Sequence, residues 1–362
     1  MEINSGISVF PPPISISSSK LAFFVVAHLQ VWSGRSRGSL RCAIWGLTRS
    51  LGSYLSSFLT KTFETDNEKV RVLAYTNVGL ILIGLGSDLK NPTYYVANPI
   101  SQQCVKIPPR PLRPLGQQEE CFRPGLVTRI EKDVLLSYKI VLMDRTNIRT
   151  GVLSLVVYSS ETGLWSFNTL QSHPQLHSMT YIDPITLNGN IYWMGFNLDV
   201  GELLVSHDLY SESDQCRVIL FPNDGTGKKF PRNCTISQDF LIYMNMVYEN
   251  RAYKLRVWRL KSGEWQLVSE IPSVTSLDYF PLGINPFHGD IMYMWSKMDR
   301  HFSSINLYKG QIGRHNNLER SSHGRTLRFA REWDPDEDRI YIPFISRFLL
   351  PRWLHPIPSS PS

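Results

Sequence analysis

The chain is poor in cysteine and lacks the spacings that cysteine chemistry needs. Its 362 residues include five cysteines, an odd number without a CxxC pair. Zinc knuckles need closely spaced Cys or His ligands, and secreted disulfide scaffolds need an even and dense set. The sequence therefore excludes both classes, and no metal or other cofactor is expected. A reducing compartment, cytoplasmic and/or nuclear, is predicted.

Long hydrophobic runs are also missing. The longest one near the start, residues 21–29, contains His28. It is far shorter than the roughly 20 apolar residues that cross a bilayer. A secretory signal would require basic residues before this run. The residues that precede it are rich in Ser and Pro instead. Neither a membrane span nor a membrane partner is predicted.

Acidic residues are scarce only at the start of the chain. The formal net charge is +7, of which +5 belongs to residues 1–63 and +2 to the remaining 299. A nucleic-acid-binding domain carries its basic patch on the folded region. Since the rest of the chain is nearly neutral, no nucleic-acid partner is predicted.

A strand-turn-strand unit is present and recurs about every 50 residues. The second strands of its four copies open with Cys104, Trp165, Cys216 and Trp265. One small antiparallel sheet cannot bury both of its faces until neighbouring sheets stack on it, so such a repeat is typical of a propeller. The sequence therefore predicts an all-β propeller, and a binding scaffold is favoured over an enzyme.

Hydrophobic periodicity divides the chain further. Apolar positions from 47 onward follow the spacing of an amphipathic helix that ends near Thr65. Beyond residue 68 the pattern changes to short apolar or alternating runs, which indicate strands. Asn188-Gly189 precedes one such run and suits a tight hairpin. The predicted strands are 79–85, 94–97, 138–143, 153–158, 191–196, 203–207, 216–221, 240–248, 253–260, 266–271, 291–295 and 304–308.

Several of these segments together resemble the F-box-associated propeller of plant F-box proteins, a large family of kelch-like domains. The matching pieces are GLIL (79–82), YYVANP (94–99) continuing to KIPP (106–109), YKIV (138–141), VYSSETGLW (157–165), LNGNIYW (187–193), LRVW (255–258) and NPFHGDIMY (285–293). The pieces occur in the family's order, and the tail 349–358 belongs to the same resemblance. The resemblance implies a kelch-like β-propeller of about six to eight blades, preceded by a short helical segment.

The resemblance also implies a function and a domain plan. In that family an N-terminal F-box binds the Skp-family adaptor of an SCF ubiquitin ligase, and the propeller captures the protein to be ubiquitinated. Residues 1–38 lack the expected F-box opening and are predicted to be a disordered or irregular leader. Residues 39–65 resemble a truncated or degenerate F-box-like helical remnant, residues 66–350 the propeller, and residues 351–362 a Pro/Ser-rich tail.

The resemblance gives candidate adaptor-binding residues within the remnant. They are Leu40, Cys42, Trp45, Leu51, Leu55 and Phe58. No residue is indicated for substrate binding. Aromatic side chains near strand ends, such as Trp193, Tyr210 and Trp295, either fill the core or serve as anchors on a binding face.

No catalytic constellation is predicted. Residues 34–38 match the GxSxG nucleophile elbow, but the antiparallel strands that follow do not supply its parallel-sheet context. His173 and His177 share a zinc-like spacing without a third ligand.

The resemblance implies one function, and two alternatives are kept beside it. The first is a substrate-recognition subunit of an SCF-type E3 ubiquitin ligase, an adaptor for ubiquitination rather than a catalyst. The second is a propeller without an F-box that binds partners and recruits no ligase. The third is a kelch-type oxidase, which would need a Tyr, His and Cys constellation that no local signature supports, and fold alone does not confer chemistry.

Overall fold

The computed structural model of the chain describes most of the repeat region and short parts of both ends. The described residues are 24–28, 43–46, 58, 61–63, 70–86, 92–99, 101–111, 124–144, 148–179, 184–222, 232–272, 279–285, 289–296, 301–315, 318–320, 326–327, 344–346 and 357–358.

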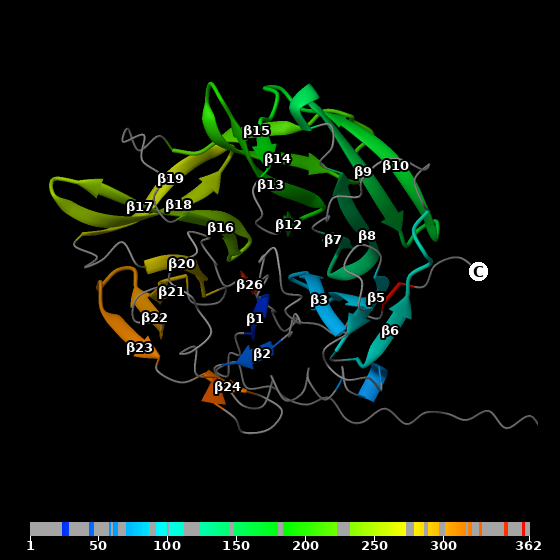
Figure 1. The fold of residues 1–362 in the computed structure, drawn as a ribbon, viewed down its shortest axis with the longest axis horizontal. Helices are drawn as coiled ribbons and strands as arrows, with labels where there is room; N and C mark the ends of the chain where they lie inside the picture. The colour runs from blue at the N-terminus through cyan, green and yellow to red at the C-terminus, as the bar shows by residue number, and fades with distance from the viewer. Residues whose placement is uncertain are drawn as a thin grey trace, which may run out of the picture.

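Five antiparallel sheets follow one another around a common axis and form a β-propeller (Figure 1). Each sheet is one blade, numbered I to V along the chain. Blade I contains β3 (Val70–Tyr75), β4 (Ile81–Leu85), β5 (Thr93–Asn98) and β6 (Gln103–Lys106). Blade II contains β7 (Gly125–Glu131), β8 (Val134–Asp144), β9 (Val152–Ser159) and β10 (Leu164–Gln171), with a 3-10 turn at Ile148–Thr150.

The next three blades follow the same plan. Blade III contains β11 (Ser178–Met179), β12 (Ile185–Leu187), β13 (Asn190–Asn197), β14 (Gly201–Asp208) and β15 (Arg217–Leu220), and both β11 and β12 pair with β13. Blade IV contains β16 (Arg232–Ser237), β17 (Phe240–Glu249), β18 (Ala252–Lys261) and β19 (Glu264–Pro272). Blade V contains β20 (Tyr279–Ile284), β21 (Ile291–Ser296), β22 (His301–Asn306) and β23 (Ile312–His315).

Strands from both ends of the chain form a further sheet, which we call the terminal sheet. Its order is β25 (Thr326–Leu327), β24 (Leu318–Arg320), β2 (Ala43–Gly46), β1 (Phe24–His28) and β26 (Phe344–Ser346). In Figure 1, β1 and β2 lie between blade V and blade I. Strand β1 falls within the predicted leader and β2 within the predicted helical remnant.

The all-β propeller is confirmed, but the predicted number of blades is wrong. The part of the chain that the structure describes forms five blades rather than six to eight. Long connections between blades, such as the residues between the end of β6 at Lys106 and the start of β7 at Gly125, leave fewer residues for blades. Segments near both ends enter the terminal sheet instead of forming blades of their own.

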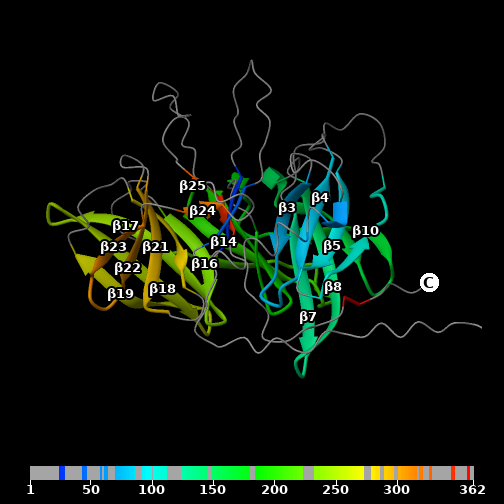
Figure 2. The same ribbon diagram turned by 90° about the horizontal axis from the view of Figure 1, so that it is seen from below.

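The first strand of each blade lies nearest the axis, where first strands of successive blades contact one another. Because successive strands are antiparallel, the turns after the first and third strands of every blade lie at one end of the propeller, where β11 and β12, which both pair with β13, count together as the first strand of blade III. We call this end the hairpin end; Figure 2 shows the propeller from the side, with the β7–β8 hairpin protruding from it. The repeat found in the sequence corresponds to the third and fourth strands of blades I to IV, and its four turns lie at this end.

Hydrophobic side chains pack between neighbouring blades and form the core. Alternate residues of β8 show the arrangement: Tyr138 and Ile140 pack toward blade I, and Val141 and Met143 pack toward blade III. Further clusters join blade III to blade IV and blade IV to blade V. Second strands such as β8 and β17 are thus covered on both faces, which explains their nearly continuous apolar runs.

Two-residue turns with positive φ close several hairpins. Asn188 and Gly189, predicted to form a tight turn, have φ values of 49° and 79°. Lys132 and Asp133 at the tip of the β7–β8 hairpin have φ values of 49° and 61°. Two consecutive positive φ values match the twist of the flanking strands, so these turns fix the register of each hairpin.

Candidate functional site

Tyr210 lies at the hairpin end, in the turn between β14 and β15 of blade III. Its backbone N–H donates to Asp208 Oδ1 at 2.9 Å, which holds the turn in place. Its ring packs against the core between blades II and III. A Cβ atom at Gly189 would stand 3.4 Å from the ring, so the neighbouring hairpin also touches Tyr210. One half-buried aromatic side chain therefore joins two turns of blade III to blade II.

Two basic side chains of blade II approach this ring. Lys139 Nζ lies 4.4 Å from the ring centroid and donates a hydrogen bond of 2.7 Å to the carbonyl oxygen of Leu209. The guanidinium carbon of Arg129 lies 5.8 Å from the same centroid. Ser137 Oγ donates to the Tyr210 hydroxyl oxygen at 3.3 Å. A ring close to two cations gains cation–π attraction, so these contacts help to fix the Tyr210 side chain.

Burial changes the acidity of the groups in this cluster. Loss of solvation lowers the pKa of Lys139 and raises the pKa of Tyr210 to about 12. The hydrogen bond from Arg129 to Glu131, 2.7 Å long, raises the pKa of that arginine. Tyr210 therefore stays protonated at neutral pH and keeps its hydroxyl proton.

Apolar side chains extend beyond this cluster on the β7–β8 hairpin. Ile130, Val134 and Leu136 are exposed, Val134 to 54%. Exposed apolar side chains on a hairpin that an ordered Tyr and Arg help to fix have the composition of a protein-interaction hot spot. We call Arg129, Ile130, Val134, Leu136, Lys139 and Tyr210 together the Tyr210 surface.

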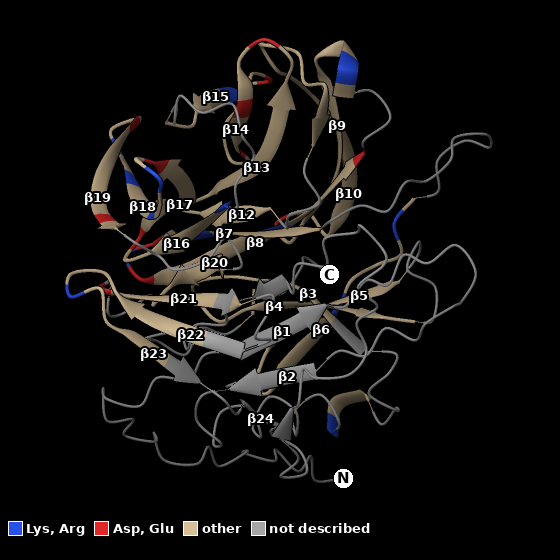
Figure 3. Cartoon of the chain, turned by 60° about the vertical axis from the view of Figure 1, so that its left-hand side comes forward, with Lys and Arg blue, Asp and Glu red and all other residues tan. Residues whose placement is uncertain are grey.

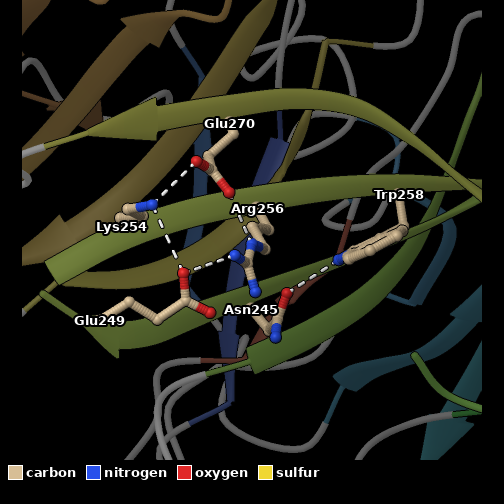
Figure 4. Close-up of polar contacts among 6 residues, drawn as sticks. All are labelled: Asn245, Glu249, Lys254, Arg256, Trp258 and Glu270. Carbon is tan, nitrogen blue, oxygen red and sulfur yellow. Dashed lines mark hydrogen bonds and ion pairs between the residues drawn. The ribbon is translucent and has the colours of Figure 1, made fainter. Parts of the chain in front are cut away.

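A second polar cluster lies on blade IV and is internally neutralised (Figure 4). Arg256 donates to Glu249 and Glu270 at 2.7 Å each, and Lys254 approaches the same two carboxylates at 3.4 and 3.1 Å. Hydrogen bonds from Arg256 and then Lys254 lower the pKa of Glu270. Two cations paired with two carboxylates leave no net charge to attract a ligand.

Figure 3 shows acidic and basic segments interspersed around the propeller, for example on β18 and β19. Both signs thus alternate along neighbouring strands of blade IV. This distribution suits a protein partner better than the phosphate backbone of a nucleic acid, which needs a basic stripe.

The structure separates the aromatic residues that the sequence analysis grouped together. Trp193 is buried in the core between blades II and III. Trp295 lies within β21, where its backbone pairs with Phe280 and Phe302. Of the three, it is Tyr210 whose described side chain is partly exposed at the hairpin end and contacts both blade II and blade III. No pattern in the sequence pointed to Arg129 and Lys139, although the apolar positions flanking Lys132-Asp133 were a usable signal for an exposed hairpin.

The candidate adaptor-binding residues fall largely outside the described part of the chain. Four of the six lie outside the described residues: Leu40, Cys42, Leu51 and Leu55. Trp45 is described only by its backbone, within β2. Phe58 is helical and 5% exposed. Residues 61–63 are helical too, and the ring of Phe63 lies edge-on to Tyr95 of β5, with centroids 5.0 Å apart. The helical segment thus packs on blade I, and its role in adaptor binding remains a prediction.

The described residues offer few of the metal-binding or nucleophilic groups that catalysis uses. These residues contain no group of three or more His, Cys, Asp or Glu side chains placed to hold a metal ion. Burial raises the pKa of Cys104 to about 11 and of Cys216 to about 12, so both thiols are protonated and weakly nucleophilic. His173 and His177 are exposed. Within the same residues, no helix has the length and apolar character that crossing a membrane requires.

Comparison with known proteins identifies the family. A family model described as F-box protein At3g26010-like, beta-propeller matches residues 35–359. The chain belongs to this F-box protein β-propeller family. It is 42% identical to F-box protein At3g28330 of Arabidopsis thaliana, across 87% of this chain and 78% of that protein. It is 32% identical to the F-box/kelch-repeat protein At1g15680 of the same plant, across 90% of this chain and 79% of that protein.

The family membership confirms the resemblance stated from the sequence. These relatives are named as F-box proteins and not as enzymes. Among solved structures, an oligogalacturonate lyase in complex with manganese is 12% identical with a TM-score of 0.37, covering 64% of this chain and 61% of that one. A likeness that weak carries no argument about function.

Proposed function

We propose that this F-box-family propeller is the substrate-recognition subunit of an SCF-type E3 ubiquitin ligase and captures its target at the hairpin end. The observation that carries the proposal is that the β7–β8 hairpin exposes Ile130, Val134 and Leu136 while contacts of its Arg129, Ser137 and Lys139 with the Tyr210 turn hold it in place. Such a surface supplies apolar anchors whose side chains lose little freedom on binding, because the hairpin beneath them is fixed. The target itself is a protein of unknown identity.

The proposed mechanism is scaffolding and involves no bond chemistry in this chain. The propeller holds the target while residues 39–65 dock a Skp-family adaptor, which places the target near the ubiquitin-transferring subunits. Holding two proteins on one chain raises the effective concentration of one near the other, to about the millimolar range for short connections. We propose a cytoplasmic and/or nuclear location, and a fluorescent fusion in plant cells tests it.

The adaptor step is tested with the full chain and a purified plant Skp-family adaptor. We expect direct binding, and we expect Leu51→Asp combined with Leu55→Asp to weaken it at least ten-fold, because a buried carboxylate opposes apolar docking. The matched control is Leu198→Asp, which changes an exposed leucine between β13 and β14. Equal binding by all three chains would contradict the assignment of residues 39–65.

A second function, a partner-binding propeller that recruits no ligase, is favoured by one observation. Phe58 is buried and Phe63 packs on blade I, so this helical segment already has a partner within the chain. A chain that fails to bind any Skp-family adaptor, yet captures a target through the Tyr210 surface, would support this second function.

A further inference from the structure

Ile357 of the C-terminal tail occupies the seam between blades I and II. It is 9% exposed and belongs to the same packed cluster as Tyr94 of blade I and Tyr138 and Tyr158 of blade II. Trp165 borders this cluster, 5.4 Å from Tyr158 and 6.2 Å from Tyr94 between ring centroids. An aliphatic side chain from the far end of the sequence thus belongs to a core cluster that includes three tyrosines.

The backbone of the tail is bound as well as its side chain. Ile357 N–H donates a hydrogen bond of 3.0 Å to Oε1 of Gln103, the first residue of β6. Ser101 Oγ donates to the same oxygen at 3.3 Å and so orients the amide of Gln103. Gln103 follows the β5–β6 turn, which places this contact at the hairpin end, the same end as the Tyr210 surface.

The sequence around Ile357 suits this kind of docking. Pro356 and Pro358 flank it, and proline has no backbone N–H. Ile357 therefore carries the one N–H donor of the three residues, and that donor is the one bonded to Gln103. A residue before proline is restricted to extended conformations, so the segment loses little conformational freedom on binding.

The equivalent seam between blades III and IV is filled locally. There Phe221, which follows β15 directly, stacks on Tyr243 at 4.3 Å and on Trp265 at 5.7 Å between centroids. The seam between blades I and II has a local residue as well, Ile107, which follows β6 directly, but its cluster also contains Ile357, which lies 254 residues beyond Gln103. A site filled by a distant, proline-flanked segment can exchange that segment for another of the same chemistry, whereas a residue fixed within a blade cannot leave.

We propose that the seam between blades I and II is a binding site for an extended peptide whose aliphatic residue is flanked by prolines, and that the chain's own tail occupies it in the free protein. A target segment of this chemistry competes with the tail. The existence of the site is independent of ligase recruitment; the identification of its ligand as a target segment rests on the proposed function. Aromatic-lined grooves that read proline-rich segments use the same physical principle.

The test uses the full chain and a fluorescent peptide of residues 351–362. Ile357→Asp in the chain should free the site, because a carboxylate does not enter an aromatic cluster. We expect this variant to bind the peptide at least ten-fold more tightly than the wild type.

The matched control is Ile312→Asp, which changes an exposed isoleucine of blade V and should bind the peptide no better than the wild type. Adding Gln103→Ala to Ile357→Asp should weaken peptide binding about five-fold, the effect of one lost hydrogen bond.

The proposal is overturned if the Ile357→Asp chain keeps the wild-type circular dichroism and melting temperature but does not bind the peptide. Gain of binding by Ile312→Asp would overturn it too. If Ile357→Asp unfolds the chain, hydrogen exchange of the wild type decides: excess peptide must accelerate exchange at Ile357, and unchanged exchange contradicts the proposal. No adaptor or target enters these assays, so their failure is distinct from failure of the ligase function.

Discussion

The indole Nε1 of Trp265 on blade IV donates a hydrogen bond of 2.9 Å to the backbone carbonyl oxygen of Leu220 on blade III. Trp165 of blade II repeats this relationship by donating to the carbonyl oxygen of Pro108, also at 2.9 Å, just after the last strand of blade I. Each tryptophan is the second residue of the fourth strand of its blade. The repeated tryptophan therefore fastens each of these blades to the outer edge of the preceding one.

The first prediction tests this fastening. Trp265→Phe keeps an aromatic ring against Phe221 and Tyr243 but removes the donor to Leu220, and should lower the free energy of unfolding by about 1 kcal/mol. Trp265→Ala also removes the ring contacts, and we expect a loss of about 2 to 4 kcal/mol for this partly buried side chain. Urea unfolding followed by tryptophan fluorescence and circular dichroism measures both.

Leu267→Ala is the control for this pair, since Leu267 lies on the same strand and is exposed. It should change the free energy of unfolding by no more than about 0.5 kcal/mol. A loss for Trp265→Phe no larger than that of the control would show that the hydrogen bond across blades adds no stability.

The burial of each strand decided how well the sequence predicted it. Each of the twelve predicted runs overlaps an observed strand, and ten of the twelve correspond to the second or third strands of the five blades. Second strands such as β4 and β17 pack on both faces, so their apolar residues are nearly continuous, while a third strand such as β18 alternates buried and charged residues. First strands such as β16, with the sequence RNCTIS, and short outer strands such as β23 carry polar residues and were missed. Their pairing partners, rather than their own composition, make them strands.

The candidate site was less predictable because its contacts join distant parts of the chain. Tyr210 was recognisable as an aromatic residue near a strand end. Its partners Lys139 and Ser137 lie about 70 residues earlier and meet it only when blades II and III pack together. The tail residue Ile357 lies further still from Gln103. Such contacts depend on the arrangement of blades around the axis, which no local pattern encodes.

The second prediction concerns the Tyr210 surface. Val134→Asp places a charge in its exposed apolar part and should reduce recovery of a bound target at least ten-fold, since a desolvated carboxylate without a partner opposes binding. Val200→Asp is the matched control: Val200 is 45% exposed, similar to Val134, and lies in the turn between β13 and β14 at the opposite end of the propeller. Quantitative mass spectrometry of proteins cross-linked to each full-length variant measures the difference. If both variants recover the same proteins in equal amounts, targets do not bind at this surface.

The third prediction is a loss of stability on mild acidification. Burial of His207 lowers its pKa below the ordinary 6.5, while the nearby Asp208 and Lys139 act in opposite directions. The unfolded chain then binds more protons than the folded chain between the lowered pKa and 6.5. This contribution to stability is complete above about pH 6.5 and is lost as the pH falls, by at most about 1.4 kcal/mol per pH unit.

His207→Gln is the variant that isolates this effect. Glutamine does not titrate, and its amide has a donor for the carbonyl oxygen of Gln215, which lies 3.4 Å from His207 Nδ1. Urea unfolding from pH 7.5 to 5.5 should therefore show a shallower pH slope for the variant than for the wild type. Parallel slopes would assign the acid sensitivity to other groups.

The fourth prediction concerns the close approach of two blades near the axis. A Cβ atom added at Gly125, the first residue of β7, would lie 2.5 Å from Cδ1 of Ile191 on blade III. Ile191 is fully buried in the core between blades II and III, so it has little room to move. Gly125→Ala should thus cost about 1 to 3 kcal/mol of stability through overpacking.

Ile191→Val removes the opposing methyl group and alone should cost about 1 kcal/mol. Because the second change makes room for the first, the double variant should be more stable than the sum of the two losses predicts, and urea unfolding of all four chains measures this coupling. Strict additivity would mean that the backbone at Gly125 shifts instead of the two side chains meeting.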